Sequence, residues 1–263
     1  SRMGGRVMNC PRCNANVAFS KKRCDNCGQD LKNYRRVVGL SNIYYNKGLS
    51  QAKVRDLSGA ISSLKLSLQF NKLNTNARNL LGLVYLEEGE IVSALSEWVI
   101  SKHYQSENND AEDYIKMIQS NPNKLETYNQ TIRKYNSALN SAKHGDEDMA
   151  IIQLKKVVNL NPKFIRAHQL LALLYMMTGK KDNRVKALKL LRNISQIDVT
   201  NTTTLRYMKE LSDVHIRGES PKVQPKVVKK EPERRTLPQV DPDAYKTITP
   251  YKEERPSIMP FIN

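Results

Sequence analysis

The long middle of the chain alternates apolar and polar residues with the period of an amphipathic helix. From residue 41 onward, apolar side chains recur every three to four positions, and Gly or a polar cluster interrupts the pattern at intervals. This pattern predicts pairs of helices joined by short turns. Small residues mark the positions where we expect the two helices of a pair to cross most closely: Gly48, Ala60, Gly82, Ala94, Ala138, Ala150, Ala172 and Ala187.

The helical pattern occurs in four copies. The first two copies begin 34 residues apart, at residues 41 and 75, and the last two begin 34 residues apart, at residues 131 and 165. The segments that we predict are repeats at 41–74, 75–108, 131–164 and 165–201, an extra helix at 109–119 and a capping helix at 203–215. Trp98 and His168 occupy packing positions of their copies, so we expect both side chains in the core.

This period and order of residues resemble the tetratricopeptide repeat (TPR) family. The resemblance covers residues 41 to about 201 and implies a mainly α fold, a TPR-type α-solenoid of antiparallel helix pairs within residues 34–216. In TPR proteins, fixed positions of each first helix commonly line a concave face that binds a protein or peptide partner. The residues that the resemblance places there are Asn42, Tyr45, Asn76, Asn79, Leu83, Leu86, Tyr135, Leu139, Arg166, Gln169, Leu173 and Met176. Their mixture of apolar and amide groups favours an apolar or helical peptide over a clamped terminal carboxylate.

All four cysteines lie in one N-terminal segment, residues 8–33. They form two Cys-x-x-Cys pairs, made by Cys10 with Cys13 and Cys24 with Cys27. One interpretation is a pair of disulfides in a secreted mini-domain, and the other is a tetrathiolate metal site. The N-terminus has no apolar signal segment, and clustered thiols in a reducing compartment usually bind metal. The spacing suits a tetrahedral Zn²⁺ site whose metal supplies the folding free energy of a segment with almost no core.

The cysteine segment resembles the zinc-ribbon family. "CPRC" and "CDNCG" look like its two knuckles, with "ANVAFSKKR" as the hairpin between them. Gly28 follows the second pair, where a knuckle often needs a positive φ angle. The resemblance implies a small zinc ribbon over residues 8–33, with Zn²⁺ as the cofactor.

The charge of the chain suggests a second function class. The net charge is +17, and residues 1–38 alone hold nine Lys and Arg against two Asp and Glu. A nucleic-acid-binding protein that uses this basic ribbon is therefore the alternative to a protein-binding scaffold. Only Phe19 and Tyr34 in this region could stack on bases, which is weak support for nucleic-acid binding.

Motifs for catalysis are missing from the sequence. It contains no nucleophile elbow, phosphate loop or metal-hydrolase signature, and its four histidines are scattered without acidic partners at ligand spacing. We therefore predict a non-enzymatic, cytoplasmic scaffold or adaptor with no catalytic residues and no small-molecule substrate.

The composition changes at residue 217. Residues 217–263 are rich in Pro, Lys, Arg and Glu, which predicts a disordered linker. The layout resembles bacterial proteins that place a zinc ribbon, then TPRs, then a linker, then a membrane anchor. The resemblance implies an anchor beginning just past Asn263 and tethering at the cytoplasmic face, since no apolar stretch long enough to span a membrane occurs before it.

Overall fold

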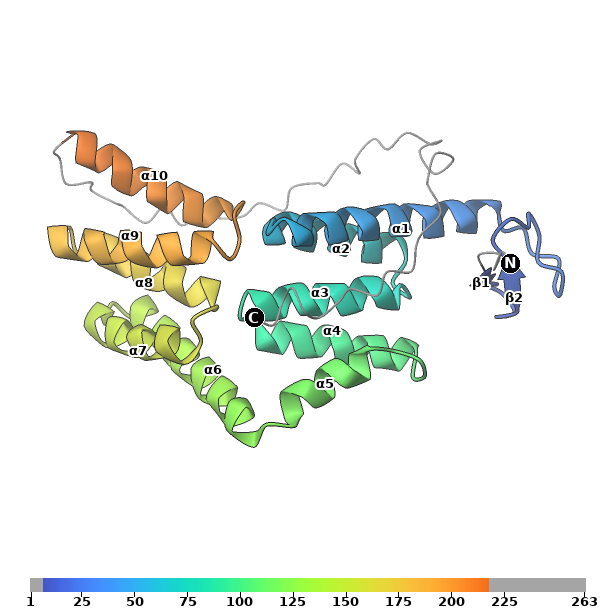
Figure 1. The fold of residues 1–263 in the computed structure, drawn as a ribbon, viewed down its shortest axis with the longest axis horizontal. Coiled ribbons are helices and arrows are strands. Elements are labelled where there is room, and N and C mark those ends of the chain that lie inside the picture. The colour runs from blue at the N-terminus through green and yellow to red at the C-terminus, as the bar shows by residue number, and fades with distance from the viewer. Residues whose placement is uncertain (1–6, 218–263) are drawn as a thin grey trace.

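The computed structural model describes residues 7–217, and the predicted linker and anchor lie beyond them. The described chain begins with two short strands and continues as helices (Figure 1). The elements are β1 Val7–Asn9, β2 Asn16–Ala18, α1 Lys32–Lys53, α2 Leu57–Phe70, α3 Thr75–Glu87, α4 Ile91–Tyr104, α5 Ala111–Gln119, α6 Pro122–Lys143, α7 Glu147–Leu160, α8 Ile165–Met177, α9 Lys181–Ser195 and α10 Thr202–Arg217.

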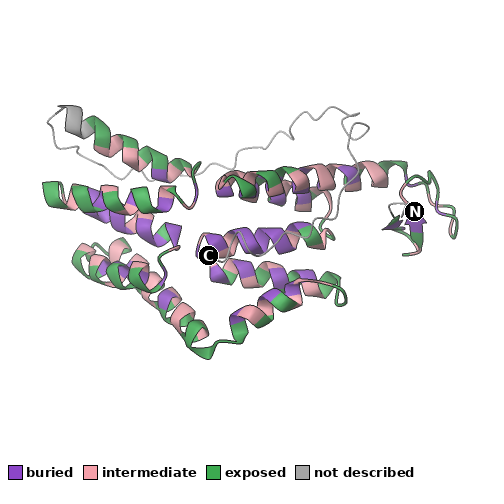
Figure 2. Cartoon of the chain, viewed as in Figure 1, coloured by how far each residue is buried: buried purple, intermediate pink, exposed green. Residues whose placement is uncertain are grey.

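The helices form four pairs, as the repeat pattern predicts. α1 packs against α2, α3 against α4, α6 against α7, and α8 against α9, while α5 and α10 are single helices. The predicted mainly α solenoid of antiparallel helix pairs is therefore confirmed for the described residues. Figure 2 shows that buried residues lie on the sides of the helices that face one another.

Two first helices are longer than the repeat pattern indicates. α1 begins at Lys32, directly after the cysteine segment, and α6 begins at Pro122, so residues 122–130 are helical. The Asn121 side chain accepts a hydrogen bond from Lys124 N at 3.0 Å, and Pro suits the first helical position because it has no N–H to satisfy. "SNPN" therefore ends one helix and starts the next at once.

Glycines allow the helices of the first two pairs to approach closely. A Cβ atom at Gly48 would lie 2.7 Å from Leu64 Cγ, and one at Gly82 would lie 2.7 Å from Trp98 Cδ1. Trp98 is fully buried, and its indole N–H donates to the backbone oxygen of Asn79 at 3.1 Å. The indole ring therefore occupies the space that a side chain at residue 82 would need.

The turn inside each pair contains a residue with a left-handed backbone. Gly89, Gly145 and Gly179 have φ angles of 76°, 81° and 68°, and Arg55 occupies the same place in the first pair with φ 63°. Glycine adopts this region without a steric cost, whereas arginine rarely does. The sequence gives no sign of a turn at Arg55, and the contacts that hold it are described below.

The helices divide into two stacks that meet at the α5–α6 corner (Figure 1). We call α1–α5 the N-terminal stack, whose core includes Leu81 and Trp98, and α6–α10 the C-terminal stack, whose core includes Leu154 and Leu171. The fully buried residues of the two stacks form separate clusters, and partly buried side chains such as Tyr128 and Ile197 pack between them. The arrangement of the stacks also depends on the polar contacts described below.

Replacing Gly82 by Ala tests the packing of the second pair. The added methyl group has to displace the Trp98 ring from a filled core, which should cost about 1–3 kcal/mol of unfolding free energy. Urea unfolding followed by circular dichroism measures this loss. An unchanged midpoint would show that Trp98 is not packed over residue 82.

Candidate functional site

The four cysteine sulfurs form a compact cluster at the N-terminus. All four Sγ atoms lie within 4.8 Å of one another, with 3.6 Å between Cys10 and Cys27 and 3.6 Å between Cys13 and Cys24. A tetrahedral metal site with metal–sulfur bonds of about 2.3 Å separates its sulfurs by roughly 3.8 Å. The cluster therefore has the ligand type and the spacing to hold one metal ion.

The two Cys-x-x-Cys turns have the same backbone geometry. Asn14 N donates to Cys10 O and Gly28 N donates to Cys24 O, each at 2.9 Å. The residue after each pair is left-handed, with φ 57° at Asn14 and 72° at Gly28, so the positive φ expected at Gly28 is confirmed. This repeated geometry directs two thiols from each turn toward one point.

The hairpin of this module differs from the sequence-based expectation. β2 lies in the segment between the two cysteine pairs, but it pairs with β1, which precedes Cys10. The hairpin therefore encloses the first knuckle, and an isolated bridge between Arg23 and Asp30 encloses the second. The prediction of a hairpin lying between the knuckles was wrong, because each cysteine pair needs its own turn to aim its sulfurs.

Without a metal ion, the clustered thiols affect one another's ionisation. A hydrogen bond from the Ala15 amide, together with one from Asn26, lowers the pKa of Cys13 to about 6. The Gln29 amide favours the Cys27 thiolate, yet burial and the three neighbouring thiols raise its pKa to about 12. The four thiols cannot all ionise at neutral pH unless a cation compensates their charge.

The basic surface of this module offers little for stacking nucleic-acid bases. The Arg35 guanidinium lies over the Phe19 ring at 5.5 Å, and Phe19 and Tyr34 both pack against the small core that surrounds the cysteines. Arg12 and Lys22 are exposed, and Lys21 pairs with Asp25 at 3.3 Å. Both aromatic rings therefore serve the internal packing of the module.

A second candidate site lies where the two stacks meet, at the turn between α3 and α4. Ile165 N donates to Glu88 O at 3.2 Å, and the Asn161 amide donates to Gly89 O at 3.1 Å. A Cβ atom at Gly89 would lie 2.6 Å from Phe164 Cα. Glycine is therefore required here for space as well as for its backbone angle. We call the contact of residues 87–90 with residues 161–166 the junction.

A buried carboxylate adds charge pairing to the junction. The Glu87 side chain is 2% exposed, and its two oxygens each accept a bond at 2.8 Å, one from Arg55 and one from Lys163. Arg166 pairs with Glu90 at 3.3 Å. Glu87 therefore joins the turn between α1 and α2 of the N-terminal stack to the C-terminal stack.

The loop between α9 and α10 makes a second contact between the stacks. The buried Asp198 carboxylate accepts from Leu57 N at 3.0 Å, from Ser58 N at 3.2 Å and from the Ser58 hydroxyl. These amides are at the start of α2, where the helix has no internal acceptors for them and its dipole favours an anion. Val199 N also donates to Arg55 O at 3.0 Å. A carboxylate from the C-terminal stack thus caps a helix of the N-terminal stack.

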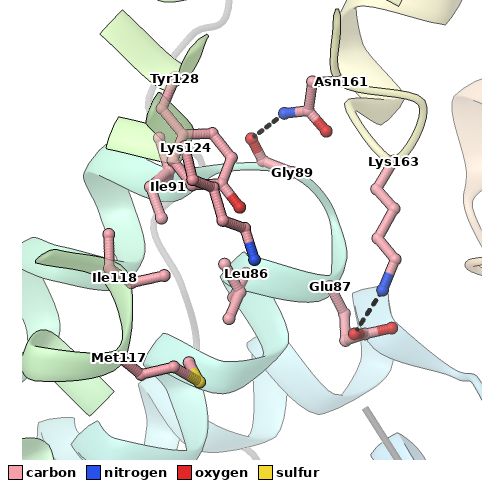
Figure 3. A pocket seen from close by; sticks show the side chains of 10 residues that line it. All are labelled: Leu86, Glu87, Gly89, Ile91, Met117, Ile118, Lys124, Tyr128, Asn161 and Lys163. Atoms are coloured by element: carbon pink, nitrogen blue, oxygen red, sulfur yellow. Dashed lines mark hydrogen bonds and ion pairs between the residues drawn. The ribbon is translucent and has the colours of Figure 1, made fainter. Parts of the chain in front are cut away.

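Two cavities flank the α3–α4 turn beside the junction. One has a volume of about 270 Å³ and the other about 300 Å³, and Gly89, Ile91, Tyr128 and Asn161 line both. Figure 3 shows the first cavity, with the Lys124 side chain extending into it from α6. Ile118 and Met117 of α5 and Leu86 of α3 add apolar walls. The cavities together form a cleft between the N-terminal stack and α6.

The predicted concave-face residues are distributed over different environments. Leu86 lines the first cavity, and Tyr135 and Arg166 line the second. Gln169 donates to Asn201 and Thr204, and Asn42 accepts from Asn74. Three further residues of the predicted face, Asn76, Leu139 and Leu173, are also partly or fully exposed.

Four of the predicted face residues are buried. Tyr45, Leu83 and Met176 lie inside the three solenoid cores, and the Asn79 amide donates to Asn109 at 2.8 Å. Their placement on a partner-binding face was therefore wrong. Neighbouring helices, and for Asn79 the loop before α5, cover the side of the first helix that the repeat pattern alone leaves open.

The sequence predictions for the two packing residues are correct. Trp98 is fully buried and His168 is 5% exposed, with His168 Nδ1 2.8 Å from the Phe164 backbone oxygen. Burial lowers the pKa of His168, which favours a neutral ring. The cavities, by contrast, were not predicted, because Lys124 and Tyr128 belong to the helical segment that the repeat pattern omits.

Comparisons with known proteins give fold similarity alone. No protein-family model matches the chain, and no curated protein matches it. The TPR domain of P58(IPK) is 17% identical with a TM-score of 0.31, over 67% of this chain and 56% of that chain. YrrB, whose structure is described as a TPR protein with an unusual peptide-binding site, is 19% identical with a TM-score of 0.28, over 68% and 95%. MamA is 21% identical with a TM-score of 0.27, over 70% and 98%.

The chain combines an N-terminal four-cysteine module with a solenoid of antiparallel helix pairs. Between residues 7 and 217, no helix combines the length and the hydrophobicity that crossing a bilayer requires.

Two glycine substitutions test the junction. Gly89→Ala and Gly145→Ala both force alanine into a left-handed backbone, at a cost of about 1–2 kcal/mol. Only the methyl group at residue 89 also collides with Phe164, since nothing lies within 4 Å of a Cβ atom at residue 145. Gly89→Ala should therefore lose clearly more unfolding free energy in urea and increase the radius of gyration measured by X-ray scattering. Equal losses and equal radii in the two variants would contradict the junction.

Proposed function

We propose that this protein is a non-enzymatic scaffold that binds a peptide segment of a protein partner in the cleft between its two stacks. The observation that carries this proposal is the pair of adjoining cavities on either side of the α3–α4 turn. Pairs of adjacent cavities suit a peptide that places successive side chains as anchors. The cleft lies between separately packed stacks, so a peptide can enter without disturbing either core.

The lining of the cleft indicates the chemistry of the peptide. Leu86, Ile91 and Ile118 supply apolar walls, and Tyr128 supplies an aromatic one. The acidic group of this cavity, Glu87, is already engaged by Arg55 and Lys163. The Lys124 ammonium group therefore adds a positive charge that an acidic side chain of the ligand would complement. A peptide with apolar anchors next to Asp or Glu fits this lining.

We further propose that the four-cysteine module holds a structural Zn²⁺ ion. Four thiolates with sulfur separations near those of a tetrahedral site form the ligand set that zinc favours. When bound, the ion compensates the thiolate charge and stabilises a module whose core is small. Cys10 and Cys24 are buried, which is consistent with a closed structural site without an open position for a substrate.

Loss of one thiol should unfold the module and leave the solenoid folded. Cys24→Ser removes a buried ligand, so the purified chain should lose its stoichiometric zinc, measured by elemental analysis. The helical circular dichroism signal should fall only slightly, because the solenoid cores do not include the cysteines. Ser67→Ala leaves the four thiols intact and serves as a control that should retain the metal. Full zinc retention in Cys24→Ser would contradict the assignment.

Peptide selection tests the cleft directly. Random peptides displayed on phage and selected on the full chain should be enriched in apolar residues next to Asp or Glu. Lys124→Gln should weaken a selected peptide by about tenfold, which corresponds to roughly 1.4 kcal/mol for one charge-assisted contact. Lys155→Gln, at an exposed position on α7, is the matched control and should leave the affinity unchanged.

A cavity-filling variant decides where the selected peptides bind. Ser93 lines the second cavity, so Ser93→Phe should abolish binding while the helical circular dichroism signal is retained. Undiminished binding to this variant, or selection that enriches no peptides, would overturn the proposed cleft.

A further inference from the structure

We propose that the two stacks move between a closed and an open arrangement by rotating about a hinge at the α5–α6 corner. The Glu88 carboxyl at the junction makes the closed arrangement more populated at acidic pH and less populated at alkaline pH. This inference goes beyond the proposed scaffold function, because it concerns the arrangement of the stacks whether or not a peptide binds. It rests on the composition of the junction, on the corner that connects the stacks, and on the charges around Glu88.

The covalent connection between the stacks is short. α5 ends at Gln119 and α6 begins at Pro122, so two residues join them. The first turns of α6 place Leu125, Tyr128 and Ile132 against the edge of the N-terminal core, where these side chains are only partly buried. A change of backbone angles at the corner would therefore move α6 away from α4 and α5 and expose these partly buried side chains at the edge of the core.

Away from the corner, the stacks hold each other mainly through polar groups. The contacts are the Ile165–Glu88, Val199–Arg55 and Asn161–Gly89 hydrogen bonds, the Glu87 pairs with Arg55 and Lys163, the Arg166–Glu90 pair, the Thr200–Asp56 bond and the Asp198 cap on α2. One apolar side chain, Ile197, packs against the cores of both stacks. Opening would hydrate the groups that these contacts bury, including the Glu87 and Asp198 carboxylates, and this hydration offsets much of the lost attraction, whereas exposing an apolar core has no such compensation. Opening at the junction is therefore the least costly large motion of this structure.

Negative charges outnumber positive ones among the groups that act on Glu88. It is half-buried at the end of α3, with Asp198 from the C-terminal stack and Glu90 from the adjoining turn acting against its ionisation, and Lys65 of α2 favouring it. The other cations nearby are engaged: Arg55 and Lys163 by Glu87, and Arg166 by Glu90. His168 of α8 is buried, and burial lowers its pKa. An ionised Glu88 thus meets the Asp198 carboxylate across the closed junction, beside the Glu90 carboxylate of its own stack.

These surroundings give the junction its pH dependence. Burial, followed by the Asp198 and Glu90 charges, raises the pKa of Glu88 to about 7 from its ordinary value of 4.5. If opening exposes the carboxyl group to water, the closed state retains a proton between pH 4.5 and 7 that the open state has lost. The ratio of closed to open molecules should therefore fall by about tenfold per pH unit as pH rises through this range, and level off above pH 7.

Opening would also reshape the candidate cleft. Gly89 and Asn161, which line both cavities, are joined by a hydrogen bond that belongs to the junction. When that bond breaks, one wall of each cavity moves with the C-terminal stack. The protonation state of one side chain thereby controls whether the cleft is formed.

The experiment measures the distance between the stacks as a function of pH. Two fluorophores are attached through non-canonical amino acids at Ser62 of α2 and Lys189 of α9, so that the native thiols remain free for metal. Single-molecule energy transfer on the full chain then gives the closed and open populations from pH 5 to pH 8.5. The closed-to-open ratio of the natural sequence should fall as stated. A ratio that does not change with pH would overturn the proposal.

Three variants separate Glu88 from other titrating groups. Glu88→Gln should abolish the fall in the ratio and keep the stacks closed throughout the range. Asp198→Asn retains a side-chain oxygen for the α2 cap but removes a negative charge that raises the pKa of Glu88. The closed-to-open ratio should therefore become constant at a lower pH than in the natural sequence. Glu107→Gln, in the exposed loop after α4, should match the natural sequence. A pH profile in Glu88→Gln identical to that of the natural sequence would show that Glu88 is not the titrating group. This outcome is independent of the Ser93→Phe result, which tests only whether peptides bind in the cleft.

Discussion

The arrangement of this molecule depends on the approach of one helix turn to one loop. At Gly89 the α3–α4 turn comes so close to Phe164 that no side chain fits between them, and Glu87 beside it binds cations from both stacks. Each stack could keep its own core without this contact, since the buried clusters are separate. The junction fixes the position of one stack relative to the other and thereby defines the cleft between them.

The junction also determines where a partner can bind. A regular solenoid would offer its first helices as a continuous concave surface, but Tyr45, Leu83 and Met176 are buried by neighbouring helices. The accessible cavities lie instead beside the α3–α4 turn, where residues of the first turns of α6 line them together with residues of α4 and α5. At the other end of α1, the four-cysteine module is connected to the N-terminal stack by one continuous helix. The candidate metal centre and the candidate cleft therefore lie in separate parts of the protein.

Local features were predictable from the sequence, and the contacts between distant segments were not. Helix pairs and the cysteine cluster follow from period and spacing within about 35 residues, and Trp98 was correctly placed in the core. The junction joins residues far apart in sequence, such as Asp198 with Leu57. From the sequence alone, Glu87 and Asp198 cannot be distinguished from acidic residues on the surface, because their partners lie in distant segments. Arg55 shows the same limit, because this left-handed residue contacts Glu87 and Val199, which lie 32 and 144 positions away in the sequence.

The most direct test of the junction is hydrogen exchange at the Ile165 amide, read by nuclear magnetic resonance. Ile165 is the first residue of α8, so its N–H has no acceptor within its own helix, and its partner is Glu88 O in the other stack. We predict exchange at Ile165 far slower than at Lys181, the first residue of α9, which is exposed. Equally fast exchange at both amides would show that the two stacks are not docked.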